Sequence, residues 1–394
     1  MKFAVIGCGY IAESYASALP YHPELQLVGA WDRDQSKLET FATRWGCRRY
    51  ASEIDLLADN NVELVLNLTN PRSHAEITRA SLEAGKHVYS EKPLGMTGEE
   101  ARVLVELASS RNLMLSSAPC GLLSETAQTV WEALRAGTVG TVHLIYANFD
   151  DGIIAPHLAP WNWRNAAGAA WPAKDEFEVG CTYEHAGYVL TWLAAFFGPA
   201  RRVTSFAACL LHDKGIAVDH MAPDFTAGCI EYDEGVIARV TCSLVAPEDK
   251  SLTIIGDKGV LRIDNVRHER CPVRYRTYKP SHLNAAIERR FDALRFRLGM
   301  PAMHNGWTSW RTIPYVSMPP RWLSGRKAVD FLRGPSEMAA ALREARTCRL
   351  SAELGQHIAE IVDALQHPKG GGRQVILSQF PVMEPTYSAT IDRR

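Results

Sequence analysis

The chain has 394 residues, of which 46% are hydrophobic and 22% are charged. This composition is typical of a folded globular protein and excludes the disordered class, and the length favours two domains over a single core. The formal net charge of −1 gives no reason to expect a nucleic acid as a partner.

The nine cysteines are dispersed and never spaced as C-x-x-C. This pattern is typical of reduced thiols and indicates neither a disulfide framework nor a zinc site, so we expect no metal. Gly7 and Gly9 interrupt the apolar start of the chain before a secretory signal can form, and no stretch approaches the roughly 18 apolar residues of a membrane-spanning helix. We therefore expect a cytoplasmic protein without an integral membrane segment.

Up to about residue 119 the chain alternates short apolar runs with helix-length segments, which is the pattern of βαβ units on a doubly wound parallel sheet. The expected strands span residues 2–6, 25–31, 62–68, 87–90 and 113–117. The clearest helices span residues 71–84 and 97–111, and the second begins with a capping box formed by Thr97 and Glu100. We predict a Rossmann domain over residues 1–119.

A glycine-rich turn follows the first expected strand. It reads Gly7-Cys8-Gly9-Tyr10-Ile11-Ala12. Gly7 allows a tight turn, Gly9 lets a pyrophosphate approach the backbone, and the small Ala12 lets the next helix pack closely on the strand. The phosphates then lie at a helix N-terminus. Tyr10 and Ile11 lie within the motif and are expected to line the same dinucleotide site.

Asp32 closes the second expected strand, where an acid binds the ribose 2′-hydroxyl of a dinucleotide. A carboxylate repels a 2′-phosphate, which favours NAD. Arg33 beside it can tolerate that phosphate, so NADP stays open as an alternative. A simpler alternative is a glycine turn without a ligand and an Asp32 that only caps the next helix.

Glu91, Lys92 and Pro93 follow the expected strand 87–90. Oxidation of an alcohol requires a proton to leave the oxygen while a hydride leaves the carbon, so a cation or acid near that oxygen lowers the barrier in both directions. Lys92 lies at the carboxyl end of a strand, beside the expected cofactor crevice, and Glu91 can orient it. The alternative is an exposed lysine that precedes a helix.

Three segments resemble the Gfo/Idh/MocA family, named after glucose-fructose oxidoreductase, inositol dehydrogenase and a rhizopine-catabolism protein. They are Glu91-Lys92-Pro93, Thr69-Asn70-Pro71-x-x-His74 and the stretch 252–264. The resemblance covers most of the chain except residues 265–335. It implies an α/β Rossmann domain followed, over residues 120–394, by an α+β domain with a large, mostly antiparallel open sheet for substrate binding and oligomerisation. It also implies a homodimer or homotetramer.

The resemblance assigns residues as well. It implies a cis peptide bond before Pro93, and cofactor contacts from Thr69, Asn70, Pro71, His74, Glu91, Lys92 and Pro93. It places substrate contacts in the region of Trp161, Trp163 and Arg164, whose aromatic faces and guanidinium suit a sugar ring. Plain packing is the alternative for these tryptophans.

The family's proton-transfer histidine is missing from the corresponding helix. Glu184, Tyr188 and Thr191 occupy the positions of the family's Asp-x-x-x-His-x-x-Asp pattern. Their spacing keeps them on one helical face, so all three can line the cleft, with Thr191 as a substrate contact. Tyr188 can transfer a proton if the charge of Lys92 lowers its pKa from about 10. His185 is the competing candidate, and burial in a core is the alternative for both.

Alternating strands indicate two antiparallel hairpins further along the chain. Residues 225–232 pair with 236–244 around a short loop that contains Gly235, and residues 252–255 pair with 260–263.

A basic insert over residues 266–333 follows these hairpins. It holds 14 Lys and Arg residues against 4 Asp and Glu residues, a net charge of +10. Inside it, apolar residues recur at helical spacing between arginines: Ile287, Phe291, Leu294 and Leu298. We expect this basic amphipathic helix to pack on the second domain or on a neighbouring subunit. An anionic substrate and loose membrane association are the alternatives.

Together these features predict an NAD(P)-dependent oxidoreductase that transfers a hydride between a nicotinamide cofactor and a hydroxyl or keto group of a sugar, polyol or sugar derivative. In this hypothesis Lys92 polarises the reacting oxygen, and Tyr188 or His185 relays the proton. The missing family histidine motivates two alternatives. One is an NAD-dependent glycoside hydrolase that acts by transient oxidation and elimination, and the other is a non-catalytic dinucleotide-binding sensor.

Overall fold

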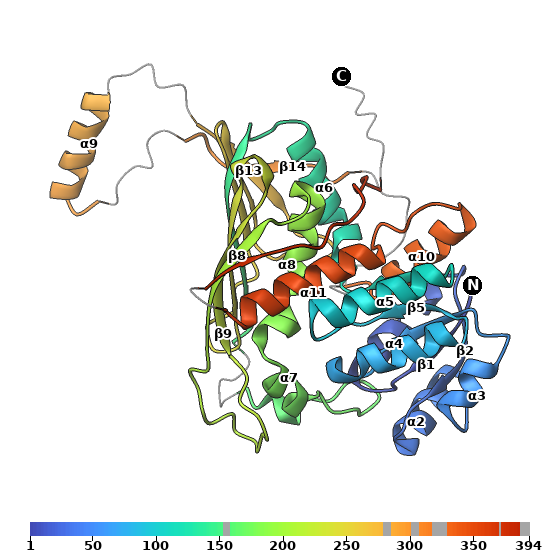
Figure 1. Cartoon of the computed structure of the whole chain (residues 1–394). Coiled ribbons are helices and arrows are strands. Elements are labelled where there is room, and N and C mark those ends of the chain that lie inside the picture. Colours follow the sequence, from blue (N-terminus) through green and yellow to red (C-terminus); the bar gives the residue numbers. More distant parts are fainter. Residues whose placement is uncertain (153–157, 279–284, 301–306, 317–328, 370–371, 387–394) are drawn as a thin grey trace.

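The computed structural model describes residues 1–152, 158–278, 285–300, 307–316, 329–369 and 372–386. Two sheets lie on either side of a group of helices, and the longest of these helices run between the sheets (Figure 1). Among the helices of the described ranges, none is both long and apolar enough to cross a membrane.

The N-terminal sheet has six parallel strands in the order β3-β2-β1-β4-β5-β6. They are β1 (Lys2–Ile6), β2 (Gln26–Trp31), β3 (Arg48–Arg49), β4 (Leu64–Asn67), β5 (His87–Ser90) and β6 (Leu115–Ser117). The predicted Rossmann fold is confirmed, with strand ends that differ from the expected ones by at most two residues. The short β3 was not predicted, because two exposed arginines carry no apolar signal.

Helices connect these strands. They are α1 (Tyr10–Ala16), α2 (Gln35–Trp45), α3 (Glu53–Ala58), α4 (His74–Glu83) and α5 (Gly98–Ser110). The expected cap of α5 is present, since the Thr97 hydroxyl accepts a hydrogen bond from the Glu100 N–H at 3.1 Å. The Glu100 carboxylate accepts from the N–H of Met96 at 2.8 Å, one residue before the position that a capping box requires.

Within the described residues, the second sheet has nine strands in the order β14-β13-β12-β11-β7-β10-β9-β8-β15. They are β7 (Val142–Asp150), β8 (Arg202–Ala208), β9 (Phe225–Glu231), β10 (Ile237–Ser243), β11 (Leu252–Gly256), β12 (Gly259–Ile263), β13 (Val273–Thr277), β14 (Arg311–Ile313) and β15 (Arg373–Val375). Both predicted hairpins, β9 with β10 and β11 with β12, are confirmed as antiparallel pairs. The central β7 pairs parallel with β10, so the sheet is mostly antiparallel, as expected.

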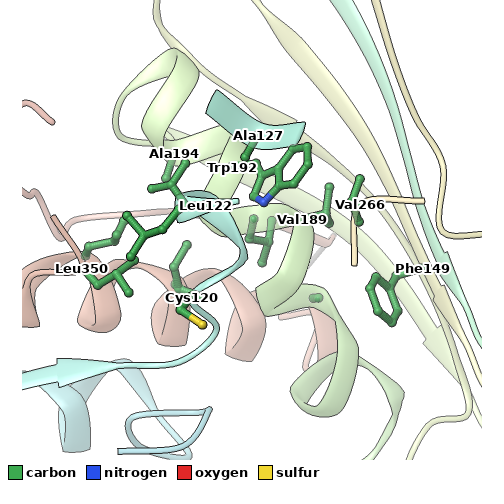
Figure 2. Packing of buried hydrophobic residues seen from close by; sticks show 14 of the residues in the cluster. Cys120, Leu122, Ala127, Phe149, Val189, Trp192, Ala194, Val266 and Leu350 are labelled. Carbon is green, nitrogen blue, oxygen red and sulfur yellow. The ribbon is translucent and has the colours of Figure 1, made fainter. Parts of the chain in front are cut away.

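The helices of the second part are α6 (Glu125–Arg135), α7 (Ala173–Val179), α8 (Cys181–Phe197), α9 (Ala285–Arg297), α10 (Arg333–Arg343) and α11 (Ala352–Gln366). Helix α8 is buried over most of its length. Its Trp192 and Val189 lie beside Ala127 of α6 and Val266, on the side of Phe149 of β7, while its Ala194 lies beside Leu122 (Figure 2). Each large side chain buried in this way contributes about 1.5–3 kcal/mol to folding. This packing fixes the orientation of α8 relative to the sheet.

Both parts of the chain contribute to one apolar core, which extends from Phe3 of β1 to Ile376 near the C-terminus. Helix α11 packs on α5 of the Rossmann part as well as on α8, and Figure 1 shows these helices side by side. A domain boundary at residue 119 therefore stays a prediction, because the structure joins the two parts by a continuous core.

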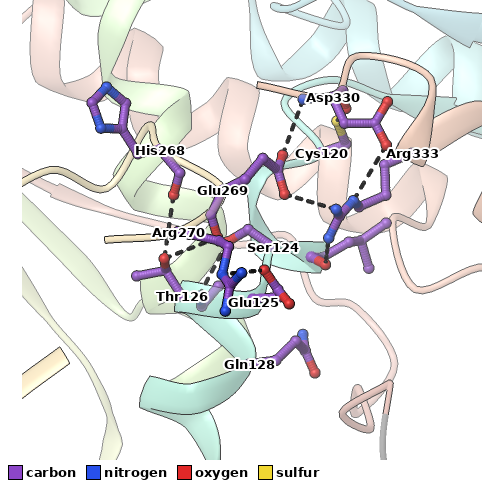
Figure 3. Close-up of polar contacts among 12 residues, drawn as sticks. Cys120, Ser124, Glu125, Thr126, Gln128, His268, Glu269, Arg270, Asp330 and Arg333 are labelled. Atoms are coloured by element: carbon purple, nitrogen blue, oxygen red, sulfur yellow. Dashed lines mark hydrogen bonds and ion pairs between the residues drawn. The ribbon is translucent and has the colours of Figure 1, made fainter. Parts of the chain in front are cut away.

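The basic insert is attached at both ends to the start of α6 (Figure 3). Thr126 donates its hydroxyl to the carbonyl of Glu269 at 3.0 Å and accepts from the N–H of Cys271 at 2.7 Å. Arg333 pairs with the Glu269 carboxylate at 2.9 Å and donates to the Leu123 carbonyl at 2.6 Å. These buried contacts hold the loop that follows β12 in a defined position.

Helix α9, in the middle of the insert, lies apart from both sheets (Figure 1). Phe291 and Leu298 of its expected apolar stripe are 62% and 66% exposed. The expected packing on the second domain is therefore not present in this structure, and packing on a neighbouring subunit stays a prediction. Arg290, Arg295 and Arg297 flank the stripe, and burying them against the sheet would remove their hydration.

Candidate active site

The glycine-rich turn has the shape that a dinucleotide requires. Gly7 has φ of +98°, and a Cβ atom there would lie 2.7 Å from the carbonyl group of Leu68, so only glycine fits. A Cβ atom at Gly9 would meet nothing within 4 Å, which leaves open space at the start of α1. Asp32 accepts hydrogen bonds from the backbone N–H groups of Cys8 and Asp34, both at 2.7 Å. An open cradle beside a fixed carboxylate fits a dinucleotide.

The two glycines predict different outcomes for alanine substitution. Gly9→Ala is expected to keep the Tm of the wild type and to weaken NADH binding by about tenfold or more, because its new methyl group enters the open cradle. Gly7→Ala is expected to lower the Tm, because it adds a backbone clash to a positive φ that costs about 1–2 kcal/mol. NADH fluorescence titration and thermal melts measure both effects.

Gly46→Ala is the control, since Gly46 has φ of +63° but its Cβ would meet nothing within 4 Å. Both variants place an alanine at a positive φ, but only Gly7→Ala adds a clash with the backbone. The difference between their Tm values therefore measures the effect of the clash alone. Equal losses of NADH affinity in Gly9→Ala and Gly46→Ala would contradict the assignment of the cradle.

The other expected cofactor residues surround this turn. Tyr10 and Ile11 are half-buried and Arg33 is exposed. The imidazole nitrogens of His74 lie 2.9 Å from the Thr69 carbonyl oxygen and 2.7 Å from that of Pro93. His74 thus joins the loop after β4, which contains Pro71, to the loop after β5. The Asn70 side chain donates to Asp175 of α7 at 2.7 Å.

Lys92 lies at the carboxyl end of β5, and the peptide bond to Pro93 is cis, as the family resemblance implies. Its ammonium forms an ion pair with the carboxylate of Glu184 on α8. Burial alone would lower the pKa of Lys92, but Glu184 and the other acidic groups nearby together outweigh this effect and raise it above its usual value. Lys92 is therefore a fixed ammonium at neutral pH.

Glu91 holds the backbone of this motif and not the ammonium. Its carboxylate accepts hydrogen bonds from the Tyr15 hydroxyl at 2.7 Å and from the Lys92 N–H at 3.0 Å. Tyr15 belongs to α1, the helix that follows the glycine-rich turn. The ammonium of Lys92 is therefore oriented by Glu184 and not, as expected, by Glu91. Glu91 instead links the backbone at Lys92 to α1, the helix that follows the glycine-rich turn.

Tyr188 and His185 both stack on Phe149 of β7. The ring centroids are 4.9 Å apart for Tyr188 and 5.2 Å apart for His185. Burial raises the pKa of Tyr188 above its usual value, although the charges of Arg267 and Lys92 lower it. The expected effect of Lys92 is thus present but smaller than that of burial. Within the described residues, the Tyr188 hydroxyl forms no hydrogen bond to the protein.

His185 is part of a separate charged group. Its Nε2 lies 2.9 Å from a carboxylate oxygen of Asp151, and the other oxygen of Asp151 pairs with Lys250. Burial opposes the ionisation of Asp151, but His185 and Lys250 hold its pKa well below the usual range. The Nδ1 atom of His185 is buried and has no partner among the described residues.

Glu176 of α7 was missed by the sequence reasoning. Burial, followed by the charge of the neighbouring Glu184, raises the pKa of Glu176 well above its usual value, although Lys92 opposes this shift. One of its oxygens is buried without a hydrogen-bond partner in the described part of the chain. A second carboxyl group, whose protonated form is favoured by burial and by Glu184, therefore lies beside the Lys92–Glu184 pair.

Glu176→Gln is expected to raise the Tm of the apo-protein at pH 8 and to leave it unchanged near pH 4. Since the pKa of Glu176 is raised in the folded state, its contribution to stability is complete below the unfolded value of about 4.3 and is lost as the pH rises. Thermal melts across this pH range measure the difference. Glu83→Gln, at an exposed position of α4, is the control. A constant difference at all pH values would contradict the proposed protonation of Glu176.

The other expected substrate residues have local partners. Thr191 is buried and donates its hydroxyl to the carbonyl of Gly187 in its own helix at 2.7 Å. Arg164 donates to the carbonyls of Trp161 and Trp163 at 3.1 and 2.8 Å. Trp163 is 37% exposed. Substrate binding by these four residues stays a prediction.

Comparison with known proteins places the chain among oxidoreductases. Residues 1–118 match the family model described as "Oxidoreductase family, NAD-binding Rossmann fold", and residues 127–262 match the "GFO/IDH/MocA C-terminal domain". Trans-1,2-dihydrobenzene-1,2-diol dehydrogenase of Mus musculus is 26% identical over 270 residues, which cover 68% of this chain and 75% of the mouse protein.

Two solved structures share the fold. The WlbA dehydrogenase from Bordetella pertussis, in complex with NADH and UDP-GlcNAcA, is 18% identical with a TM-score of 0.68, and the match covers 96% of this chain and 98% of that one. The aldose-aldose oxidoreductase from Caulobacter crescentus is 16% identical with a TM-score of 0.69, and the match covers 93% and 96% of the two chains. At these identities the likeness shows the fold alone.

Proposed function

Because the chain belongs to the Gfo/Idh/MocA family of oxidoreductases, whose first domain is an NAD-binding Rossmann fold, we propose that it transfers a hydride between NAD and a hydroxyl or keto group of a sugar, polyol or sugar derivative. One observation carries this proposal: the buried ammonium of Lys92, paired with Glu184, is tied through Glu91 and Tyr15 to the glycine-rich turn. The names of the dehydrogenases that the chain matches support the reaction class.

The residues that would hold the cofactor are Gly7, Gly9, Ala12 and Asp32. Each oxygen of the Asp32 carboxylate accepts one backbone N–H, which fixes the carboxylate beside the cradle, and its negative charge favours NAD over NADP. When bound, NAD supplies the hydride chemistry. The protein has to stabilise the charge on the substrate oxygen and to move one proton to or from it.

Lys92 stabilises the negative charge that develops on the substrate oxygen, because its ammonium is fixed and largely shielded from water. Tyr188 moves the proton. Its hydroxyl donates to the oxygen during ketone reduction, and its phenolate accepts from the hydroxyl during alcohol oxidation. We assign this role to Tyr188 because its hydroxyl is not engaged by the described protein atoms, whereas Nε2 of His185 is bound to Asp151. His185 is a positioning residue in this mechanism.

The proposal is tested by NADH fluorescence titration, followed by an assay of nicotinamide absorbance with NAD+ and a panel of polyols and sugars. We expect saturable NADH binding and NADH formation with at least one substrate class. Release of nitrophenol from a nitrophenyl glycoside without net absorbance change would favour the hydrolase alternative. Tight NADH binding without turnover of any compound would favour the sensor. Neither alternative gains support from the named relatives.

We also propose that the protein acts in the cytoplasm as a homodimer or homotetramer, with a domain boundary near residue 119. The nine free cysteines support a reducing compartment. Phe206 of β8 is 61% exposed on the nine-stranded sheet, which supports an interface there. Light scattering of the purified protein tests the assembly, and a monomer at micromolar concentration would contradict it.

A further inference from the structure

We propose that the guanidinium of Arg267 binds a carboxylate of the substrate, so that the preferred substrates are acidic sugars or polyols such as uronic or aldonic acids. This inference rests on the proposed dehydrogenase function and adds a substrate class to it. Arg267 belongs to the loop that follows β12, outside the segments from which the family resemblance was drawn.

The loop delivers Arg267 to the site described above. Asn265 forms a bridge with Lys250, and the Val266 N–H donates to the Lys250 carbonyl at 2.9 Å. The Asn265 side chain accepts from the N–H of Arg267 at 2.9 Å, which shapes the turn. The guanidinium carbon of Arg267 lies 5.4 Å from the centroid of the Tyr188 ring. A cation is thus held against the face of the residue that moves the proton.

The cations of this site differ in their partners. The ammonium of Lys92 pairs with Glu184, and that of Lys250 pairs with Asp151. No carboxylate of the described ranges lies within ion-pair distance of Arg267. Tyr188, and then Asp151, Glu176 and Glu91, raise the pKa of Arg267, but none of them forms an ion pair with it. Of these three cations, Arg267 alone has no ion-pair partner among the described residues.

Three other arginines of the same insert pair with acids, whereas Arg276 lies over the rings of Trp307 and Trp310. Arg270 pairs with Glu125 at 3.0 Å, Arg333 pairs with Glu269 at 2.9 Å, and Arg274 pairs with Asp264. Withdrawing a guanidinium from water without such a partner costs free energy. A substrate carboxylate would supply the missing partner, and the planar fork of arginine matches its two oxygens.

The position of Arg267 also limits the size of the substrate. Arg267 lies against the Tyr188 ring, and the charge of Lys92 also acts on this side chain, so both cations lie near Tyr188. A carboxylate on Arg267 and a reacting carbon near Lys92 must then belong to the same small molecule. This arrangement favours an acid group within a single sugar or polyol unit over the distant phosphates of a nucleotide sugar.

The test compares matched substrates. We expect the wild type to have a higher kcat/KM for galacturonate than for galactose and for gluconate than for sorbitol. Arg267→Gln is expected to lower this acid-to-neutral ratio by about 10- to 100-fold, the range for a hydrogen bond to a charged group. Arg267→Lys keeps the charge but loses the bidentate contact, so its acid-to-neutral ratio should lie between those of the wild type and Arg267→Gln. Arg274→Gln, at a half-buried position of β13 where the arginine pairs with Asp264, is the control and should keep the wild-type ratio.

Calorimetric binding of galacturonate to the enzyme–NADH complex gives a second readout that does not need turnover. We expect galacturonate to bind the wild-type complex, and we expect its affinity to fall at least tenfold in Arg267→Gln while the Tm is unchanged. This result would support the inference even if no substrate in the panel were oxidised. The proposed reaction would then be contradicted, but the carboxylate site would be supported. A wild type that oxidises neutral sugars as well as acids, or a ratio that Arg267→Gln does not change, would overturn the inference and leave the dehydrogenase standing.

Discussion

Lys92→Met is expected to lower kcat/KM by about 10³-fold while NADH affinity stays within about twofold of the wild type. The ammonium is the positive group that the structure fixes at the carboxyl end of β5, and methionine replaces its chain at similar length without the charge. Because the cofactor cradle is formed by the glycine-rich turn, the loss should appear in the chemical step and not in binding of NADH. Stopped-flow measurement of hydride transfer separates the two.

Two further variants make this result interpretable. Lys92→Met leaves the carboxylate of Glu184 buried without its partner, which costs stability. The double variant with Glu184→Gln removes that charge and should recover the Tm but not the activity. Lys86→Met is the matched control, since Lys86 is also buried but donates to the Asp59 carbonyl at 2.8 Å. If Lys92→Met turned over substrate like Lys86→Met, Lys92 would have no part in the mechanism.

The first domain could be predicted because its signals are local. The strand that ends at Ile6, the positive φ required at Gly7 and the cap at Thr97 are each encoded within a few neighbouring residues. The hairpins of the second sheet were found for the same reason. The central β7 was missed. Its partners β10 and β11 lie about 90 to 110 residues further along the chain, so no short turn connects β7 to a partner strand.

The site was predicted only in part, since its charges are arranged by tertiary packing. Glu184, Tyr188 and His185 could be named because they lie in one helix at readable spacing. The partnership of Asp151 with Lys250 and the approach of Arg267 to Tyr188 join segments far apart in the sequence. Glu176 carried no motif at all. The two acidic residues at the end of β7, Asp150 and Asp151, are a signal that could have pointed to this region.

Tyr188→Phe is expected to lower kcat by about 10²- to 10³-fold in both directions of the reaction and to remove the pH dependence of alcohol oxidation. In the wild type, oxidation requires the phenolate. Since burial raises the pKa of Tyr188 above its usual value of about 10, its rate should rise steadily with pH through the neutral and mildly alkaline range. Ketone reduction requires the protonated hydroxyl, so its rate should stay flat over the same range and fall only at higher pH.

His185→Gln is the discriminating partner of Tyr188→Phe. In the proposed mechanism His185 only holds its place beside Asp151 and Phe149, so this variant should lose some activity but keep the rise of the oxidation rate with pH. Profiles of kcat/KM against pH for the three proteins, measured in both directions, give the comparison. A profile that stays pH-dependent in Tyr188→Phe and becomes flat in His185→Gln would show that the imidazole of His185, and not Tyr188, moves the proton. The raised pKa of the buried phenol would then be a consequence of packing on Phe149, with no part in the chemistry.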